Sequence, residues 1–155
     1  MVVPATRRGG LAAFLAIAMA VLLVVGAAPQ RAQAATTMRQ RMLALTNHAR
    51  ETHDRKDLKL NVKLSRLAKK HSRDMMEAGY LFHTDVDVLK KALAPYDWSV
   101  GGENIGVGVS LSDVQSGFMD SKVHRKNILL KTYDHAAIGV ARSDGKVWVT
   151  VIFYG

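Results

Sequence analysis

The sequence predicts an α+β fold, an α-β-α sandwich in which helices flank a small antiparallel sheet. Two observations lead to this fold class. Segments between residues 35 and 120 carry apolar side chains at the i, i+3, i+4 and i+7 spacing of helices. Strands are predicted at VGGENIGVGV (100–109) and in a C-terminal pair, HAAIGVAR and KVWVTVIFYG. Because the last strand is apolar on both faces, a covering layer is expected on each side of the sheet.

The N-terminus is predicted to be a Sec-type signal peptide, residues 1–34, outside this fold. Two arginines precede an apolar stretch at 11–25, and Ala32-Gln33-Ala34 fits an A-x-A cleavage site. An uncleaved membrane anchor is the alternative, because residues 11–28 are just long enough to span a bilayer. Cleavage leaves a single domain, residues 35–155, in a secreted or extracellular protein.

The first two helices follow from their apolar stripes. Residues 35–54 form the first, and a polar loop ending in Leu58 and Leu60 follows. The second lies between Asn61, a good N-cap, and Gly79, a typical C-cap residue. His71 falls on its apolar face, where we expect a core histidine with one satisfied nitrogen.

The remaining helices are shorter. One is predicted at 85–93, because Pro95 prevents its continuation. Another begins at the capping box Ser112-Asp113-Val114-Gln115 and ends near Asp120. A turn with a short helical piece at 125–129 then leads to the hairpin, whose loop is Ser143-Asp144-Gly145.

The predicted strand at 100–109 carries a carboxylate on an apolar face. Side chains alternate along a strand, so Glu103 shares a face with Ile105, while Asn104 points to the other. Burial of an unpaired charge is costly, so Glu103 requires hydrogen-bonding or charged partners. The candidates are histidines at loop or element ends, His83 and His124.

Composition limits the possible functions. The chain has no cysteine, which excludes thiolate nucleophiles and cysteine-ligated zinc, and it is more typical of bacterial than of animal or plant secreted proteins. Its formal net charge of +9 favours anionic surfaces. The basic residues are scattered, so no nucleic-acid partner is predicted. We expect a monomer.

Three segments in order resemble one family. They are LNVKLSRLAKKHSRDMMEAGYLFHTD, then GENIGVG, then FMDSKVHRKNILLKTYDHAAIGVA. The order and spacing are similar to those of the CAP superfamily, which includes cysteine-rich secretory, antigen five and pathogenesis-related proteins. The chain is most similar to the cysteine-free, secreted SCP-like branch of bacteria. The resemblance covers residues 38–155 and implies an α-β-α sandwich with a central cleft.

The resemblance also implies which residues line that cleft. They are His83, Glu103 and His124, with the two histidines as the implied ligands of Zn²⁺ or another divalent metal. Ser121 stands where several eukaryotic members carry a second glutamate, so it joins the cleft set, and Val123 replaces a usual glycine. Asn104, Arg125 and Asn127 are expected to brace the surrounding loops.

Three classes of function remain open. The first is a binding module for a lipid, an anionic cell-surface polymer or an extracellular protein. The second is divalent metal binding by the two histidines. The third is metal-assisted, peptidase-like hydrolysis, with Glu103 as the base and His83 and His124 beside it. A Ser-His pair at Ser121 lacks an identifiable third group and oxyanion site.

Overall fold

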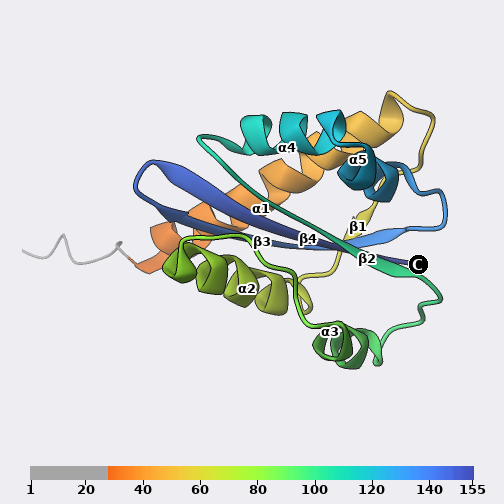
Figure 1. Ribbon diagram of the computed structural model, residues 1–155, viewed down its shortest axis with the longest axis horizontal. Coiled ribbons are helices and arrows are strands. Elements are labelled where there is room, and N and C mark those ends of the chain that lie inside the picture. Colours follow the sequence, from red (N-terminus) through yellow and green to blue (C-terminus); the bar gives the residue numbers. More distant parts are fainter. Residues whose placement is uncertain (1–27) are drawn as a thin grey trace, which may run out of the picture.

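The computed structural model describes residues 28–155, in which a four-stranded sheet lies between two layers of helices (Figure 1). The elements in chain order are α1 (Ala28–Glu51), β1 (Lys59–Leu60), α2 (Ser65–Ala78), α3 (Val86–Leu93), β2 (Gly101–Gly108), α4 (Leu111–Asp120), α5 (Lys122–Leu129), β3 (His135–Ser143) and β4 (Lys146–Tyr154). The predicted signal peptide lies outside the described residues except for 28–34, which begin α1.

The sheet has the strand order β1-β3-β4-β2. The three long strands are antiparallel, as predicted, with Glu103 opposite Ile152 in β2–β4 and Ala137 opposite Ile152 in β3–β4. The two-residue β1 adds a parallel pairing with β3, in a segment for which only a loop was expected. Two residue pairs suffice because buried Leu58 anchors the segment beside them. β2 is therefore one edge of the sheet.

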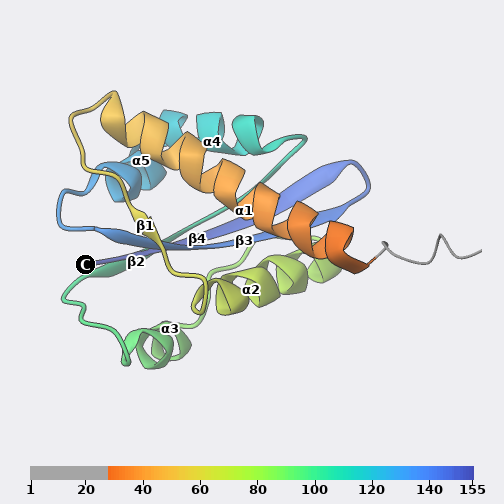
Figure 2. The same ribbon diagram turned by 180° about the vertical axis from the view of Figure 1, so that it is seen from behind.

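The helices form the two expected covering layers. α2 and α3 lie on one face of the sheet, and α1, α4 and α5 lie on the other (Figure 1); the view from behind shows the same arrangement (Figure 2). Side chains of β4 alternate between the two faces of the sheet. Those of Val149, Val151 and Phe153 join the core beneath α1 and α4. Ile152 and Trp148 point to the α2 side.

Two helix ends differ from the prediction. α1 ends at Glu51 rather than near 54, because Asp54 takes a left-handed conformation (φ 55°) and the Arg55 N–H bonds back to the Arg50 carbonyl at 2.9 Å. The N-cap of α4 is Ser110, not Ser112. Its hydroxyl accepts from the Asp113 N–H at 3.0 Å, and a start there places Leu111, Val114 and Phe118 on the core face.

The other local signals agree more closely with the structure. Asn61 Oδ1 accepts from the Leu64 N–H at 2.9 Å and caps the turn before α2, although the N-cap of the helix itself is Leu64 and not Asn61. Gly79 ends the helix at φ 79°. His71 is buried, and its Nε2–H donates to the Phe82 carbonyl at 2.7 Å. The hairpin loop contains two residues in the left-handed region, Asp144 and Gly145. α5 is a full helix from Lys122, longer than the piece expected at 125–129.

α2 lies in backbone contact with the sheet at one point. A Cβ on Gly139 of β3 would overlap the backbone of Ala68 in α2. The missing side chain therefore lets the helix approach this closely. The pair Ser72 Oγ and Thr150 Oγ1 (2.9 Å) adds a buried hydrogen bond between α2 and the sheet.

The side chain of Arg50 joins segments distant in the sequence. It is fully buried, and its guanidinium donates to the carbonyls of Ile128 (2.6 Å), Leu130 (3.1 Å) and Tyr133 (3.0 Å), while its Nε–H donates to the Lys56 carbonyl (2.7 Å). Burial lowers the pKa of Arg50. The interaction ties the end of α1 to the end of α5 and to the chain entering β3.

We predict that Arg50→Met lowers the free energy of unfolding by about 3–5 kcal/mol, because four carbonyl oxygens lose their donor in a site with little water. Urea unfolding followed by circular dichroism measures the change. Arg41→Met is the matched control, since Arg41 is exposed on the same helix. Equal stability of the two variants would contradict the role assigned to Arg50.

Candidate functional site

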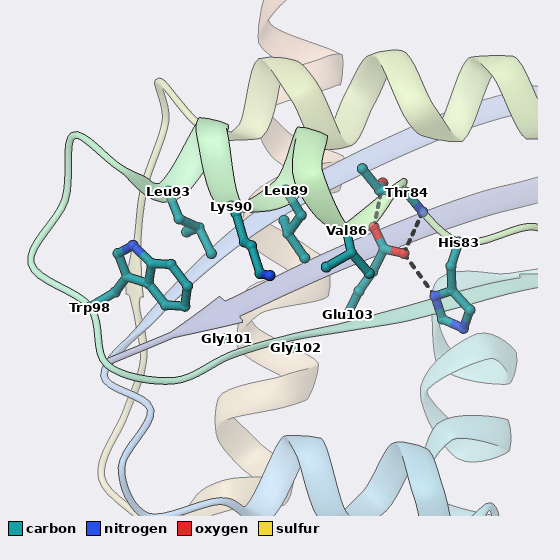
Figure 3. Close-up of a pocket in the computed structure, with 10 residues that line it drawn as sticks. All are labelled: His83, Thr84, Val86, Leu89, Lys90, Leu93, Trp98, Gly101, Gly102 and Glu103. Carbon is teal, nitrogen blue, oxygen red and sulfur yellow. Dashed lines mark hydrogen bonds and ion pairs between the residues drawn. The ribbon is translucent and has the colours of Figure 1, made fainter.

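A pocket of about 360 Å³ lies between α3 and the start of β2. Leu89 and Leu93 of α3 and the indole of Trp98 form its apolar part, and Lys90 reaches in from the same helix (Figure 3). Gly101 and Gly102 of β2 form the floor. His83, Thr84 and Glu103 lie together at the opposite end from Trp98 (Figure 3).

The carboxylate of Glu103 is buried, and both of its oxygens accept hydrogen bonds. Its side chain is 5% exposed. Oε1 accepts from His83 Nδ1–H at 2.8 Å and from the Thr84 N–H at 3.0 Å, and Oε2 accepts from the Thr84 hydroxyl at 2.6 Å. These three donors satisfy the charge that the sequence places on an apolar face. The carboxylate therefore fixes the 83–84 segment against the strand.

His83 is the solvent-facing member of this group. Its side chain is 62% exposed, and Nδ1 is occupied by Glu103. In the neutral ring this bond places the proton on Nδ1 and leaves the Nε2 lone pair free. His83 can therefore accept a hydrogen bond from a ligand while Glu103 holds the ring in place.

His124 lies near His83, but it is not the hydrogen-bonding partner of Glu103 that the sequence suggested. No hydrogen bond joins its ring to Glu103 in the described part of the chain, because alternation along β2 turns Glu103 toward α3 while α5 covers the other face. Its ring packs on Phe118 with centroids 5.2 Å apart. Burial, and then the positive charge of nearby His83, lower the pKa of His124.

The three supporting residues hold α5 against β2 and α4. Asn104 is fully buried, donates to the His124 carbonyl at 3.0 Å and accepts from Asn127 Nδ2 at 2.9 Å. Asn127 Nδ2 also reaches the Glu103 carbonyl at 3.3 Å. Arg125 donates to the Met119 carbonyl at 2.7 Å and joins α5 to α4. All three side chains bond to the protein itself.

Ser121 has no partner that would make it a nucleophile. It is the residue between α4 and α5, and its hydroxyl forms no capping hydrogen bond. Within residues 28–155, no hydrogen bond connects it to either histidine of the site. The structure therefore gives Ser121 a place in the junction between two helices and no catalytic partner among the described residues.

The residues of the site do not make a complete metal centre. Across residues 28–155, no three His, Cys, Asp or Glu side chains are grouped so that they could hold a metal ion. Both oxygens of Glu103 already accept hydrogen bonds, which leaves the two imidazoles as the better candidates for ligands among the described residues of the site. An ordinary zinc site has at least three protein ligands.

Sequence reasoning missed Thr84 and the α3 wall. Thr84 donates two hydrogen bonds to Glu103, from its N–H and its hydroxyl. The sequence could have indicated this role, since Thr84 directly follows the predicted site residue His83. Leu93, Lys90 and Trp98 gave no such signal, because an amphipathic pattern shows that a helix packs but not against which strand.

Comparison with known proteins adds a family and a fold. Residues 43–153 match the model of the CAP, or cysteine-rich secretory protein, family. The chain is 31% identical over 116 residues to YkwD of Bacillus subtilis, covering 70% of this chain and 44% of YkwD. It is 33% identical over 112 residues to the membrane protein YlbC of that organism, covering 69% and 32%. The chain thus spans less than half the length of these relatives.

Solved structures share the fold. An extracellular protein containing an SCP domain from Bacillus anthracis matches with a TM-score of 0.69 at 23% identity, over 85% of this chain and 45% of that one. An outer surface protein from Borrelia burgdorferi matches with a TM-score of 0.61 at 19% identity, over 74% and 90%. These similarities concern the arrangement of helices and strands.

The lowered pKa of His124 predicts a pH-dependent stability. Below its ordinary value of 6.5, the unfolded chain binds a proton at His124 that the folded chain does not yet bind. The free energy of unfolding should therefore fall as the pH drops from about 7 to about 5. We expect His124→Gln to reduce this fall.

Thermal unfolding at several pH values provides the measurement. His48→Gln is the control, because His48 is exposed on α1 far along the chain from the site. If the wild type and His124→Gln lose the same stability over this range, His124 is not the group responsible.

Proposed function

Because the chain belongs to the CAP family, whose model matches residues 43–153, we propose that it is a binding module that takes a small, lipid-like ligand into the pocket between α3 and β2. The observation that carries this proposal is the pocket itself. Its volume of about 360 Å³ lies within the range of about 300–1,000 Å³ typical of small-molecule sites.

The lining supports a ligand with an apolar body. Leu89, Leu93 and Trp98 offer apolar surface, while the polar groups of Glu103 and His83 lie at the other end. Such a lining, mostly apolar with a few placed polar groups, favours binding and orientation of an organic molecule. An anionic polymer or an extracellular protein would need a broader contact surface than this pocket provides.

The metal-assisted hydrolase receives less support. A general base must reach the proton that it removes, yet both oxygens of Glu103 already accept hydrogen bonds from His83 and Thr84. Its carboxylate is better suited to positioning His83 than to activating water. We therefore assign Glu103 a positioning role and do not propose a catalytic one.

We also propose that the protein acts outside the cytoplasm. The arginine pair, apolar stretch and Ala32-Gln33-Ala34 support export, and the Bacillus anthracis and Borrelia proteins are described as extracellular and outer surface proteins. None of the helices between residues 28 and 155 combines the length and apolar character that crossing a bilayer requires. N-terminal sequencing of the protein recovered from a secreting host should start at Ala35; recovery only of the full chain in the cell would contradict export.

Pocket binding can be tested with the neutral dye N-phenyl-1-naphthylamine, whose fluorescence rises in apolar surroundings. We expect the wild type to bind it and Val86→Trp to weaken binding by about tenfold, or about 1.4 kcal/mol, because the indole fills the pocket from its rim. Val86 lines the pocket and is 62% exposed, so the change leaves the core intact.

Val88→Trp is the matched control, since Val88 is exposed on the same helix and does not line the pocket. Binding that survives in Val86→Trp, or that falls equally in both variants, would place the dye elsewhere. A folded wild type that does not bind the dye would also overturn the proposal.

A further inference from the structure

The free edge of β2 carries backbone groups that point away from the rest of the sheet. Val100 and Gly155 exchange two hydrogen bonds of 3.1 Å, so the even-numbered residues of β2 are those that bond to β4. The N–H and C=O groups of Glu103, Ile105 and Val107 therefore point outward. Within residues 28–155, only one of these outward groups has a hydrogen-bond partner, the carbonyl of Glu103.

These backbone groups lie at different depths along the edge. The side chain of Glu103 is 5% exposed while the residue as a whole is half-buried, so its exposed surface belongs to the main chain. Val107 is exposed, and Ile105 between them is 6% exposed. An N–H and a C=O without a protein partner are costly at a residue as buried as Ile105, and an added strand would satisfy both.

Both sides of this edge are walled, which decides what can reach it. On the α2 side, Thr84 donates to the Glu103 carboxylate and holds the 83–84 segment against the strand. On the other side, Asn127 of α5 donates to Asn104 and to the Glu103 carbonyl. A second copy of the chain carries the same walls, which would keep the two β2 edges apart. A single extended peptide is narrow enough to enter.

We propose that an extended peptide segment of a partner protein adds to the outer edge of β2 as a fifth strand of the sheet. The backbone groups of Ile105 and Val107 supply the hydrogen bonds, as in other cases of strand addition. This interaction goes beyond the small-molecule ligand proposed above and does not depend on it.

The wall on the α2 side indicates which peptide side chains fit. Phe82 packs against the cluster that contains Ile105, and the exposed ring of Tyr80 lies 5.4 Å from that of Phe82. Side chains alternate along a strand, so every second residue of the peptide shares this face. We therefore expect a preference for apolar residues at alternate positions.

A tethered peptide tests the proposal. The chain has no cysteine, so Val109→Cys introduces one attachment point just beyond the edge, at an exposed residue. The probe is the peptide CGGTVTFT, joined through a disulfide, and CGG alone is the reference. Because a short tether gives an effective concentration of about millimolar, we expect exchange of the Ile105 and Val107 amide hydrogens, followed by NMR, to slow by about tenfold.

Two N-methylated probes separate strand addition from apolar contact. Alternate N–H groups of an added strand point toward β2. Methylation of either the valine and phenylalanine or the last two threonines should therefore abolish the protection, while methylation of the other pair should leave it. Loss of protection with both probes, or with neither, would show that the peptide does not pair as a strand.

The position of the tether provides the matched control. Val62 is exposed and follows β1, at the opposite edge of the sheet, so the same peptide on Val62→Cys should leave exchange at Ile105 and Val107 unchanged. Equal slowing from both attachment points would overturn the proposal. Unchanged exchange in the folded Val109→Cys conjugate would overturn it as well.

Discussion

The buried guanidinium of Arg50 is the interaction on which the arrangement of one helical layer depends. It binds backbone carbonyls at the end of α5 and before β3, so these segments cannot move independently of α1. Asn127 then links α5 to the site, because its side chain bonds to Asn104 and to the Glu103 carbonyl of β2. Removal of charge-bearing donors from such a buried site leaves acceptors that water cannot reach.

The site is built around the open edge of the sheet. β2 has β4 on one side only, and the segment carrying His83 approaches it from the α2 face while α5 approaches from the other. Small residues in β2 make the second approach possible, since a Cβ on Gly102 would lie 2.5 Å from the Tyr133 hydroxyl and 3.3 Å from Asn127 Oδ1 of α5.

The sequence was sufficient for the fold class because its signals were local. Apolar spacing located α2, Asp144-Gly145 located the hairpin, and alternation placed Glu103 and Asn104 on opposite faces. The family resemblance brought His83 and Glu103 together, which no spacing argument could do across 20 residues. What the sequence could not supply depends on tertiary packing. The pairing of β1, the buried contacts of Arg50 and the pocket wall formed by α3 are all set by residues distant in the chain.

The way in which α3 is attached has a kinetic consequence. α2 is locked to the sheet by backbone contact at Gly139, but α3 is held chiefly by Leu93, its one buried residue, with Leu89 packed beside it. Local opening of an element with few buried contacts costs much less than global unfolding. In the proposed binding function, local displacement of this one short helix would alter how long a ligand stays in the pocket without unfolding of the rest of the domain.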